Sequence, residues 1–451
     1  MQMAFLMTDG TILTQGNSDA ASWYKYTPDS SGSYADGTWT QVASLQSGYA
    51  PSAFASDVLA DGRLLIMGGE YNSPGNYDLQ LVNLGAIYDP VANTWTPMNH
   101  PGGWGHIGDS PSTVLPNGLF AIGNKLTKRD ATWNPATGHW NGTPGTGKAD
   151  FNAEEGWTLL PDGTILTEDV KDSTNSEIWN PSTGVWKSAG STIANLRSQS
   201  PFHQCLTYGP NQPKDCYYPP GEIGPAILRP NGTVFATGSG EGGSGYGDGN
   251  TAVYTIKTGK WAAGPNFPND DNAGDSWGML EPNGDVLVFG VGGGMYDFNG
   301  TTFTQVGSSS GVPILLPTGQ IAMFGSNVTL YTPPGSPKAS WAPTIKTVAK
   351  TLTHGTTYKI TGTQFNGWGQ AMSVGDEYQN ATNYPLVRIT NNTTNHVFYA
   401  RTHGHSTMGV ATGKLPVSTN FDVPSTIDTG PSKLVVVANG IASKPVAVTI
   451  K

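Results

Sequence analysis

The sequence predicts an all-β fold, a seven-bladed β-propeller followed by an immunoglobulin-like β-sandwich. Three observations lead to this prediction. A short hairpin motif recurs seven times, a strand–turn–strand element with a Trp follows most copies, and the last part of the chain changes to alternating β-branched segments. Four-stranded units repeated around an axis are typical of propellers, and many short strands within about 100 residues are typical of sandwiches.

Composition narrows the class of protein. The chain has 451 residues, including 60 Gly and 33 Pro, and only 12% of its residues are charged. Gly and Pro interrupt helices, which excludes a helical bundle, and the 10% of aromatic residues exclude a disordered chain. The net charge of −10 argues against a nucleic-acid partner, which needs a basic surface. No apolar run approaches the length of about 18 residues that a membrane span requires.

The repeated hairpin motif sets an Asp-Gly, Asn-Gly or Thr-Gly turn between two apolar runs, as in LMTDGTILTQG and LRPNGTVFATG. Such turns between apolar runs indicate β-hairpins. Because seven copies occur at intervals of 35 to 69 residues, we interpret each copy as the first hairpin of one blade. The turn glycines are Gly10, Gly62, Gly118, Gly163, Gly232, Gly284 and Gly319.

The second element completes the blades. It contains a strand, a turn and a Trp-bearing strand, as in IYDPVANTWTPM and IWNPSTGVWKSAG. We predict that its aromatic residues pack between blades; they are Trp39, Trp95, Trp140, Trp186, Trp261 and Phe303. The seventh unit is short, because a Gly-Ser-Pro linker follows Leu330 to Pro333. Its fourth strand is expected from the segment around Trp341 or from residues before Met1.

The character of the chain changes near Pro343. Segments such as PLVRIT, HVFYART and KLVVVANGIASKPVAVTI alternate apolar and polar residues and are rich in β-branched side chains. This pattern predicts the sandwich. We therefore expect residues 1–338 to form the propeller and residues 339–451 to form the second domain.

Two cysteines bear on the cellular compartment. Cys205 and Cys216 lie in one short polar loop, which favours a disulfide and an oxidising environment. The alternative is a pair of free thiols in a cytosolic protein. No leader is recognisable in Met1–Phe5, which has no charged segment. We expect a secreted, cell-surface or periplasmic protein, and whether a cleaved leader precedes Met1 stays open.

The repeats and the C-terminal VVANGIASKPVAVTI resemble the galactose oxidase and glyoxal oxidase family, which has a kelch-type propeller and a terminal Ig-like domain. The resemblance covers nearly the whole chain. It implies a copper ion on the propeller axis, bound by two Tyr and a His from loops that enter the inner strands, and by a His from the C-terminal domain. One of those Tyr is cross-linked to a Cys in the family.

This sequence departs from that pattern. It has no Tyr-His pair, and its two Cys share one loop, so the Tyr–Cys copper-radical cofactor is not expected. In the family, the ligands from the inner-strand loops stand nine or ten residues before the turn glycine of a blade. In this sequence acids occupy those positions instead. Asp109, Glu154 and Asp275 each stand nine residues before a turn glycine, and Glu222 stands ten before one. These four acids and His106 are the predicted catalytic residues.

Further residues are expected at the same mouth of the propeller. Glu70, Asp169 and Glu241 follow second strands, and Glu155 adjoins Glu154. The predicted substrate-binding residues are Tyr49, Glu70, Trp104, Glu155, Trp157, His203, Glu241 and Trp277. The alternative is that the acids cap backbone N–H groups or pair with Lys125, Lys128 and Arg129. His403 and His405 alternate along an extended segment, so they are either candidate metal ligands or structural residues at a domain interface.

Crowded carboxylates repel one another unless a proton or a cation lies between them. They could hold Ca²⁺, or one could protonate a glycosidic oxygen while another acts as base or nucleophile. The first hypothesis is therefore a secreted, monomeric glycan hydrolase or lyase acting on a carbohydrate or another small polar substrate. The second is a propeller that binds a glycan or protein without catalysis. The third is a divergent metal oxidase.

Overall fold

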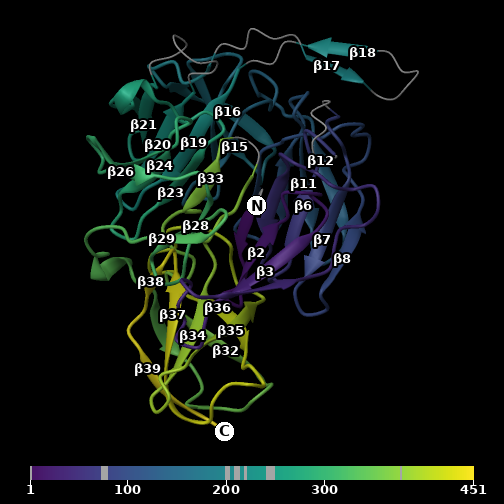
Figure 1. Cartoon of the computed structure of the whole chain (residues 1–451). Coiled ribbons are helices and arrows are strands. Elements are labelled where there is room, and N and C mark those ends of the chain that lie inside the picture. Colours follow the sequence, from purple (N-terminus) through teal and green to yellow (C-terminus); the bar gives the residue numbers. More distant parts are fainter. Residues whose placement is uncertain are drawn as a thin grey trace.

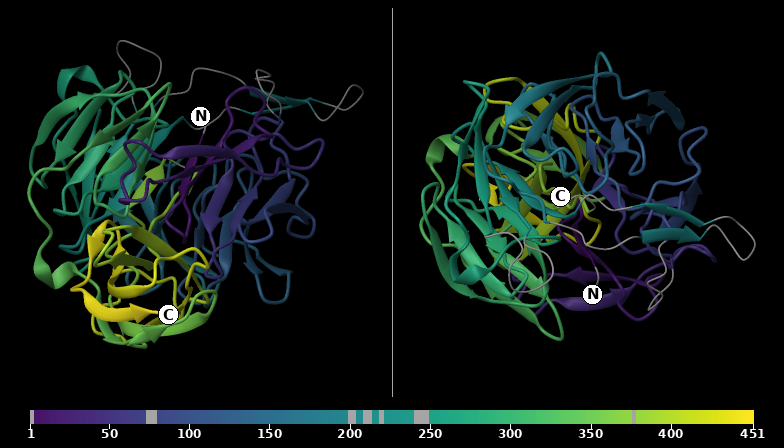
Figure 2. Two further views of the ribbon diagram at one scale, coloured as in Figure 1. Left: turned by 60° about the horizontal axis from the view of Figure 1, so that its bottom comes forward. Right: turned by 90° about the horizontal axis from the view of Figure 1, so that it is seen from above.

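The computed structural model describes residues 3–72, 80–198, 221–239, 249–375 and 378–451, together with the backbone of 204–207 and 214–217. Seven sheets stand around a common axis, and the C-terminal strands cover one end of this propeller (Figure 1). Figure 2 shows the blades arranged as a ring when the molecule is seen from above. The predicted all-β fold with a seven-bladed propeller is confirmed.

The first four blades each contain four antiparallel strands in chain order. The strands are β1 (Ala4–Leu6), β2 (Ile12–Gln15), β3 (Trp23–Thr27) and β4 (Thr38–Gln41); β5 (Ala55–Val58), β6 (Leu64–Met67), β7 (Gly85–Asp89) and β8 (Thr94–Met98); β9 (Ser112–Val114), β10 (Phe120–Gly123), β11 (Asp130–Asn134) and β12 (His139–Thr143); and β13 (Thr158–Leu159), β14 (Ile165–Glu168), β15 (Asn175–Asn180) and β16 (Val185–Ser191).

A separate hairpin, β17 (Gln204–Thr207) and β18 (Lys214–Tyr217), precedes the fifth blade. The last three blades are β19 (Ile223–Leu228), β20 (Thr233–Gly238), β21 (Thr251–Thr255) and β22 (Lys260–Ala263); β23 (Trp277–Leu280), β24 (Val286–Phe289), β25 (Gly294–Phe298) and β26 (Phe303–Ser308); and β27 (Val312–Leu315), β28 (Ile321–Phe324) and β29 (Val328–Tyr331). The described helices are the two 3₁₀ turns η1 (Pro268–Asp270) and η2 (Ala339–Trp341), and among described residues no helix is long and apolar enough to cross a membrane.

Burial falls from the inner to the outer strand of each blade. Every residue of β2 and β6 is buried, whereas every residue of β4 is exposed. The inner strands are short runs of Ile, Leu, Val and Met because both of their faces pack against neighbouring blades. The repeated Trp residues lie in the fourth, outermost strands, where they connect one blade to the next.

The repeated Trp side chains bridge successive blades, as the sequence predicts. Trp95 Nε1–H donates to the Ala43 carbonyl at 3.0 Å, and Trp140 Nε1–H donates to the Asn99 carbonyl at 2.6 Å. Trp186 repeats the bridge from the fourth blade to the third. Each bridge buries an aromatic ring and satisfies its N–H, so one residue both packs and fixes the angle between blades.

The ring closes between the seventh and the first blade. Trp39 and Phe324 pack edge to face with ring centroids 5.7 Å apart. Among the described residues the seventh blade has three strands. The expectation of a fourth strand around Trp341 is wrong, because this residue ends the 3₁₀ turn η2 instead.

The C-terminal unit is a curled mixed sheet. Its strands are β30 (Thr344–Thr347), β31 (Thr351–Leu352), β32 (Thr357–Thr363), β34 (Leu386–Asn391), β35 (Val397–His403), β36 (Val417–Asp422), β37 (Gly430–Ala438), β38 (Ile441–Ala442) and β39 (Val446–Ile450). The sheet curls at β35, which pairs with β34 through its first half and with β36 through its second half. β31 and β39 form a parallel pair. The finer immunoglobulin-like likeness stays a prediction.

This sheet packs against the turns of the repeated hairpin motif. The ring of Tyr399 lies so close to Gly10 that a Cβ there would stand 2.4 Å from it, and the φ of Gly10 is +76°. Both facts require glycine at that turn. The repeated turns therefore face the C-terminal unit. The opposite ends of the same strands form the face of the propeller that points away from the C-terminal unit, and we call it the free face.

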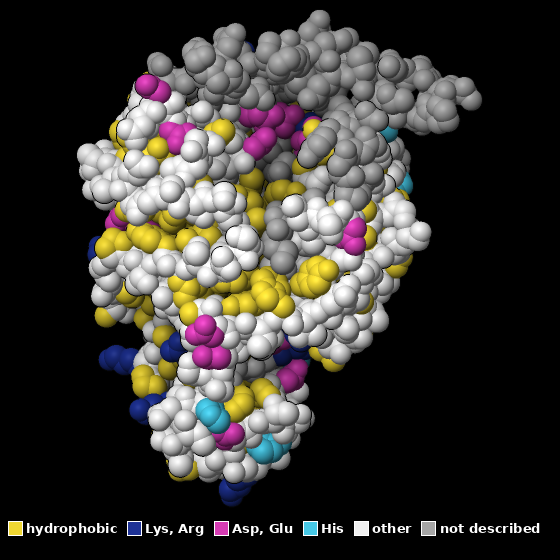
Figure 3. All heavy atoms as spheres, in the orientation of Figure 1, with side chains coloured by type: hydrophobic (Ala, Val, Ile, Leu, Met, Phe, Trp, Pro, Cys, Tyr) yellow, Lys and Arg dark blue, Asp and Glu magenta, His cyan; other side chains and the backbone are white. Residues whose placement is uncertain are grey.

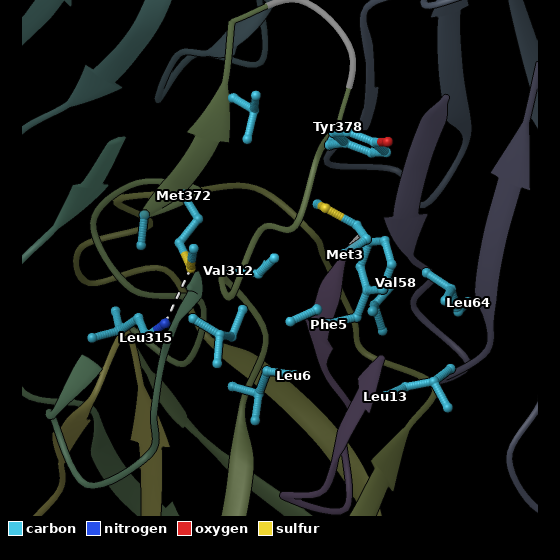
Figure 4. Packing of buried hydrophobic residues seen from close by; sticks show 14 of the residues in the cluster. Met3, Phe5, Leu6, Leu13, Val58, Leu64, Val312, Leu315, Met372 and Tyr378 are labelled. Carbon is cyan, nitrogen blue, oxygen red and sulfur yellow. Dashed lines mark hydrogen bonds between the residues drawn. The ribbon is translucent and has the colours of Figure 1, made fainter. Parts of the chain in front are cut away.

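One segment of the C-terminal unit leaves it and enters the propeller. The described residues 364–375 and 378–385, which we call the axial segment, include β33 (Met372–Val374), and β33 pairs with the inner strand β23 of the sixth blade. Figure 1 shows β33 in the middle of the propeller, away from the other C-terminal strands. In Figure 4, Met372 and Tyr378 lie among side chains from the first, second and seventh blades.

The axial segment contacts every blade. It receives a hydrogen bond from Leu315 N–H of the seventh blade to Met372 Sδ at 3.1 Å. Gly369 lies against the Leu228 carbonyl of the fifth blade. The first four blades form hydrogen bonds with the buried side chains of Gln370, Tyr378, Asn380 and Tyr384. The axis is therefore filled by a segment whose apolar side chains join the hydrophobic core and whose polar groups bond to the inner strands.

Gln370 provides a test of this filling. Its Oε1 accepts from Leu159 N–H and its Nε2 donates to Thr113 Oγ1, both at 2.8 Å. Gln370→Ala leaves both partners unpaired in a buried position and should lower the free energy of unfolding by about 1–3 kcal/mol, measured by urea denaturation. Gln41→Ala on the exposed strand β4 is the matched control, and equal loss in both variants would contradict this role.

Candidate functional site

The free face of the propeller carries acidic residues from several blades. Figure 3 shows acidic side chains gathered near the end opposite the C-terminal unit. Asp109, Glu154 and Asp275 stand just before β9, β13 and β23, and Glu70 follows β6. The register predicted from the turn glycines thus places these residues at the same end of their blades.

The backbone at this register is unusual. The φ angles of Ala53, Glu154 and Asp275 are 50°, 59° and 44°, and each of these residues enters the first strand of its blade. For a residue with a Cβ this conformation costs roughly 1–2 kcal/mol. Such strain persists only where the surrounding fold enforces it, and it is frequent at functional sites.

A buried lysine joins two of the predicted acids. Lys125 Nζ contacts Asp109 and lies 2.7 Å from a Glu154 oxygen. All three side chains are almost fully buried. Burial raises the pKa of Asp109, although the Lys125 ammonium opposes that shift. The pairing with Lys125 that the sequence left open as an alternative is what the structure shows for Asp109 and Glu154.

Glu70 lies beside this group and is only half-buried. Burial and the negative charges of Asp109 and Asp275 raise its pKa to about 7, while Lys125 and a hydrogen bond with Tyr71 oppose the shift. Asp275 is exposed. Glu70 and Asp275 are therefore electrostatically coupled, and Glu70 titrates near neutral pH.

The tip of the axial segment borders these acids. Tyr378 Oη accepts a hydrogen bond from Ala53 N–H at 2.6 Å, and its ring lies parallel to the ring of Trp277 at a centroid distance of 6.4 Å. Trp277 is half-buried and follows Asp275 by two residues. An aromatic pair thus stands next to the exposed carboxylate.

Three predicted substrate-binding aromatics are core residues instead. Tyr49, Trp104 and Trp157 are 1%, 4% and 2% exposed. Trp157 packs against Trp179 and Trp186, and the Tyr49 hydroxyl donates to the Gly68 carbonyl. Their rings are covered on both sides, so no face is left for a substrate. His106, a predicted catalytic residue, is half-buried and its Nδ1 lies 3.3 Å from the Leu81 carbonyl.

The other predicted acids lie apart from the Lys125 group. Glu222 stands directly before β19, at the same end of its blade as Asp109, Glu154 and Asp275; it is half-buried, and its N–H donates to Ser198 Oγ. Glu155 turns away from Glu154 and lies 2.7 Å from Lys148 Nζ, so it belongs to a separate buried group. His203 and Glu241 lie outside the described residues.

His403 and His405 do not reach the free face. His403 pairs with Asp422 at 3.0 Å, and the buried His405 bonds Thr419 Oγ1. The His405 N–H donates to the Ala60 carbonyl, at the opposite end of the β5–β6 hairpin from Glu70. Metal binding at the axis by this pair is therefore wrong, and the alternative of an interface role fits. His405 stays neutral because burial lowers its pKa to about 3.

The two cysteines occupy paired strands. Cys205 in β17 stands opposite Cys216 in β18 in the antiparallel register. Their side chains lie outside the described residues. The disulfide between them stays a prediction.

Two participants of the site, Tyr71 and Tyr378, are not among the residues predicted from the sequence, and Lys125 is predicted only as a possible partner of the acids. Tyr378 had a detectable signal, because QFNGWGQAMSVGDEYQNATNYP interrupts the alternation of the C-terminal unit with a long Asn- and Gly-rich stretch. A stretch of that length without secondary structure signals is frequently functional.

The ion group on this face does not fit copper. Copper favours imidazole and thiolate ligands, whereas Lys125, Asp109 and Glu154 supply one ammonium and two carboxylates. The position between Asp109 and Glu154 is filled by Lys125 Nζ. The axial segment that reaches this face contains no histidine.

Comparison with known proteins adds a fold likeness only. No protein-family model and no curated protein matches the chain. A fungal alcohol oxidase of the AA5 family, solved in complex with copper, is 14% identical, and the match covers 99% of this chain and 96% of that one with a TM-score of 0.53. The extracellular domain of a protein described as a one-component system of B. thetaiotaomicron is 10% identical, covering 100% of this chain and 55% of that one with a TM-score of 0.47. The chain is thus similar in fold to a galactose oxidase-like propeller.

Lys125→Met tests the buried ion group. Removing the ammonium leaves Asp109 and Glu154 as uncompensated buried carboxylates, which should cost about 3–5 kcal/mol of unfolding free energy. The loss should shrink at low pH, where protons replace the missing charge. Chemical denaturation at neutral and acidic pH measures it. Lys128→Met removes an exposed lysine that bonds only backbone carbonyls in the described contacts. If both variants lose the same stability, the ion group has no special role.

Proposed function

We propose that this protein is a secreted hydrolase of uncharged glycans, with Glu70 as general acid and Asp275 as base or nucleophile. The observation that supports this most is the coupling of a half-buried carboxyl, whose pKa is about 7, to an exposed carboxylate on the same face. Two carboxyl groups whose environments separate their pKa values are the working pair of most glycosidases.

Glu70 suits the acid role. A general acid is most effective when its pKa lies near the working pH, because it is then both protonated and able to give up the proton. Asp109 and Glu154 are closed off by Lys125, but burial of Glu70 and the charge of Asp109 raise the pKa of Glu70 to about 7. In the proposal, Glu70 transfers its proton to the glycosidic oxygen as the bond to the sugar carbon breaks.

Asp275 suits the second role because it is exposed beside Glu70. Its carboxylate either removes a proton from the attacking water or forms a bond to the sugar carbon that water then cleaves. Trp277 and Tyr378 form the neighbouring aromatic pair. A sugar ring stacks well on such a surface.

The charge of the face favours a neutral substrate. Glu70, Asp109, Glu154 and Asp275 outnumber Lys125, so a uronic acid would meet a negative surface. Elimination by a lyase requires the substrate carboxylate to be neutralised, and the described residues of this face supply no excess positive charge for that. Hydrolysis therefore ranks above the lyase reaction in this proposal. The opposed cysteines of β17 and β18 support a location outside the cytoplasm.

A second candidate is glycan binding without catalysis. The observation that favours it is that Asp109 and Glu154, two of the acids predicted to be catalytic, are already engaged by Lys125. Calorimetric binding of a neutral oligosaccharide without release of reducing ends would select this candidate over hydrolysis.

Glu70→Gln tests the hydrolase. Reducing-end release from a panel of neutral glycans should fall by about 10²–10⁴-fold, the usual contribution of a general acid. In the unchanged protein, kcat/KM should fall as pH rises through about 7, because Glu70 loses its proton there. Glu281→Gln is the control, since Glu281 is a buried acid with a pKa raised to about 8 at the β23–β24 turn, far from this face. An unchanged rate and pH profile in Glu70→Gln would remove Glu70 from the mechanism.

A further inference from the structure

A second group of acids lies inside the propeller, apart from Glu70 and Asp275. It surrounds Lys148, in the loop before β13, and it contains Asp150, Glu155, Asp169 and Glu177. Asp150 and Asp169 are 3% exposed, Glu177 is 2% exposed and Glu155 is fully buried. This Lys148 group brings together the β12–β13 loop, the end of β14 and strand β15.

One ammonium cannot satisfy this group. Lys148 Nζ lies 2.7 Å from Glu155 Oε2 and 3.2 Å from Glu177 Oε2, while Asp150 Oδ1 is 3.7 Å away, beyond hydrogen-bond distance. When all four are ionised, these carboxylates share a single positive charge in an interior of low dielectric, and burial accordingly raises the pKa of Glu155 and of Asp169. Burial of unbalanced charge of this kind costs several kcal/mol per ion.

The three carboxylates that carry an unsatisfied oxygen also form a close cluster. Asp150 Oδ1, Glu155 Oε1 and Asp169 Oδ1 have no hydrogen-bond partner in the described part of the chain, and none is reached by solvent. Asp150, Glu155 and Asp169 each offer an oxygen within 4.8 Å of the others. That spread matches the span across a cation with oxygen ligands at about 2.3–2.6 Å.

The groups around these oxygens fix their positions. Thr167 Oγ1 donates to Glu155 Oε2, and Asp172 N–H donates to Asp150 Oδ2 at 3.2 Å. Asn175 Nδ2 donates to Asp169 Oδ2. In each carboxylate one oxygen is therefore held by the protein, while the other is left for a ligand. Hydrogen bonds of this type orient metal-binding carboxylates.

We propose that Asp150, Glu155 and Asp169 bind one calcium ion between the third and fourth blades. All three ligands are hard oxygens, which Ca²⁺ prefers and which soft metals do not. Lys148 stays in place and holds Glu155 and Glu177 on the other side. The ion adds two positive charges to a group that carries an excess of three negative charges when all its carboxylates are ionised.

The site is independent of the proposed hydrolysis, although it touches the same loop. Glu155 follows Glu154, whose side chain meets Lys125 at the axis. A bound ion would hold this loop and so stabilise the strained backbone at Glu154, where φ is 59°. Loss of the ion should therefore lower stability whether or not the protein cleaves glycans.

Terbium luminescence tests the site directly. Tb³⁺ replaces Ca²⁺ at oxygen sites and emits when a nearby indole is excited, and the Trp186 ring centroid lies 4.5 Å from Lys148 Nζ. We expect a saturable signal at one ion per chain, competed away by Ca²⁺, with few coordinated waters from lifetimes in H₂O and D₂O. Removal of Ca²⁺ by a chelator should lower the melting temperature, and adding it back should restore it.

Three variants make the outcome specific. Asp169→Asn should abolish the saturable signal and the Ca²⁺ effect on melting. Glu70→Gln, at the axial face, and Asp285→Asn, in the separate group formed with Glu281 and Asp297, should keep both. If Asp169→Asn does not fold, the terbium signal and the Ca²⁺ effect on melting of the unchanged protein test the proposal. The proposal is overturned if that protein gives no saturable signal, if the bound ion is highly hydrated as on a surface, or if Glu70→Gln or Asp285→Asn removes it.

Discussion

The filled axis is the constraint on which the rest of the structure depends. A propeller of separate sheets leaves a channel where the inner strands meet, and their edge N–H and C=O groups need partners there. In this chain the axial segment supplies them, from the pairing of β33 with β23 to the bond between Leu315 and Met372. The position of each inner strand, and so of each acid that precedes it, follows from that contact.

The chemistry of the free face depends on how buried charge is balanced. Lys125 neutralises Asp109 and Glu154 in part, and the negative charge that remains acts on Glu70. Burial first, and the charge of Asp109 second, raise the pKa of Glu70 to about 7, whereas the same carboxyl would be fully ionised in water at neutral pH. The interior group around Lys148 follows the same rule with a larger imbalance, because its carboxylates have less compensation and less contact with solvent.

The parts of this arrangement that could be predicted from sequence are those set by local rules. Turn glycines such as Gly10 mark hairpins because only that backbone fits, and counting back from them located Asp109, Glu154 and Asp275. The sequence could not decide between a functional acidic site and pairing of the acids with Lys125. That choice depends on which side chains from different blades lie together in the interior. The roles of Trp157 and Trp104 were misjudged because a Trp near acidic loops has the same local pattern whether its ring is buried or open.

The origin of the axial segment also has a consequence for biosynthesis. The strand that completes the centre of the ring begins near residue 364, after all seven blades have been made, and its last contact is Tyr384 with the Leu6 carbonyl of the first blade. A ribosome therefore releases the blades in order while the axis is still open. The inner strands therefore receive their axial partners only once the C-terminal unit has emerged.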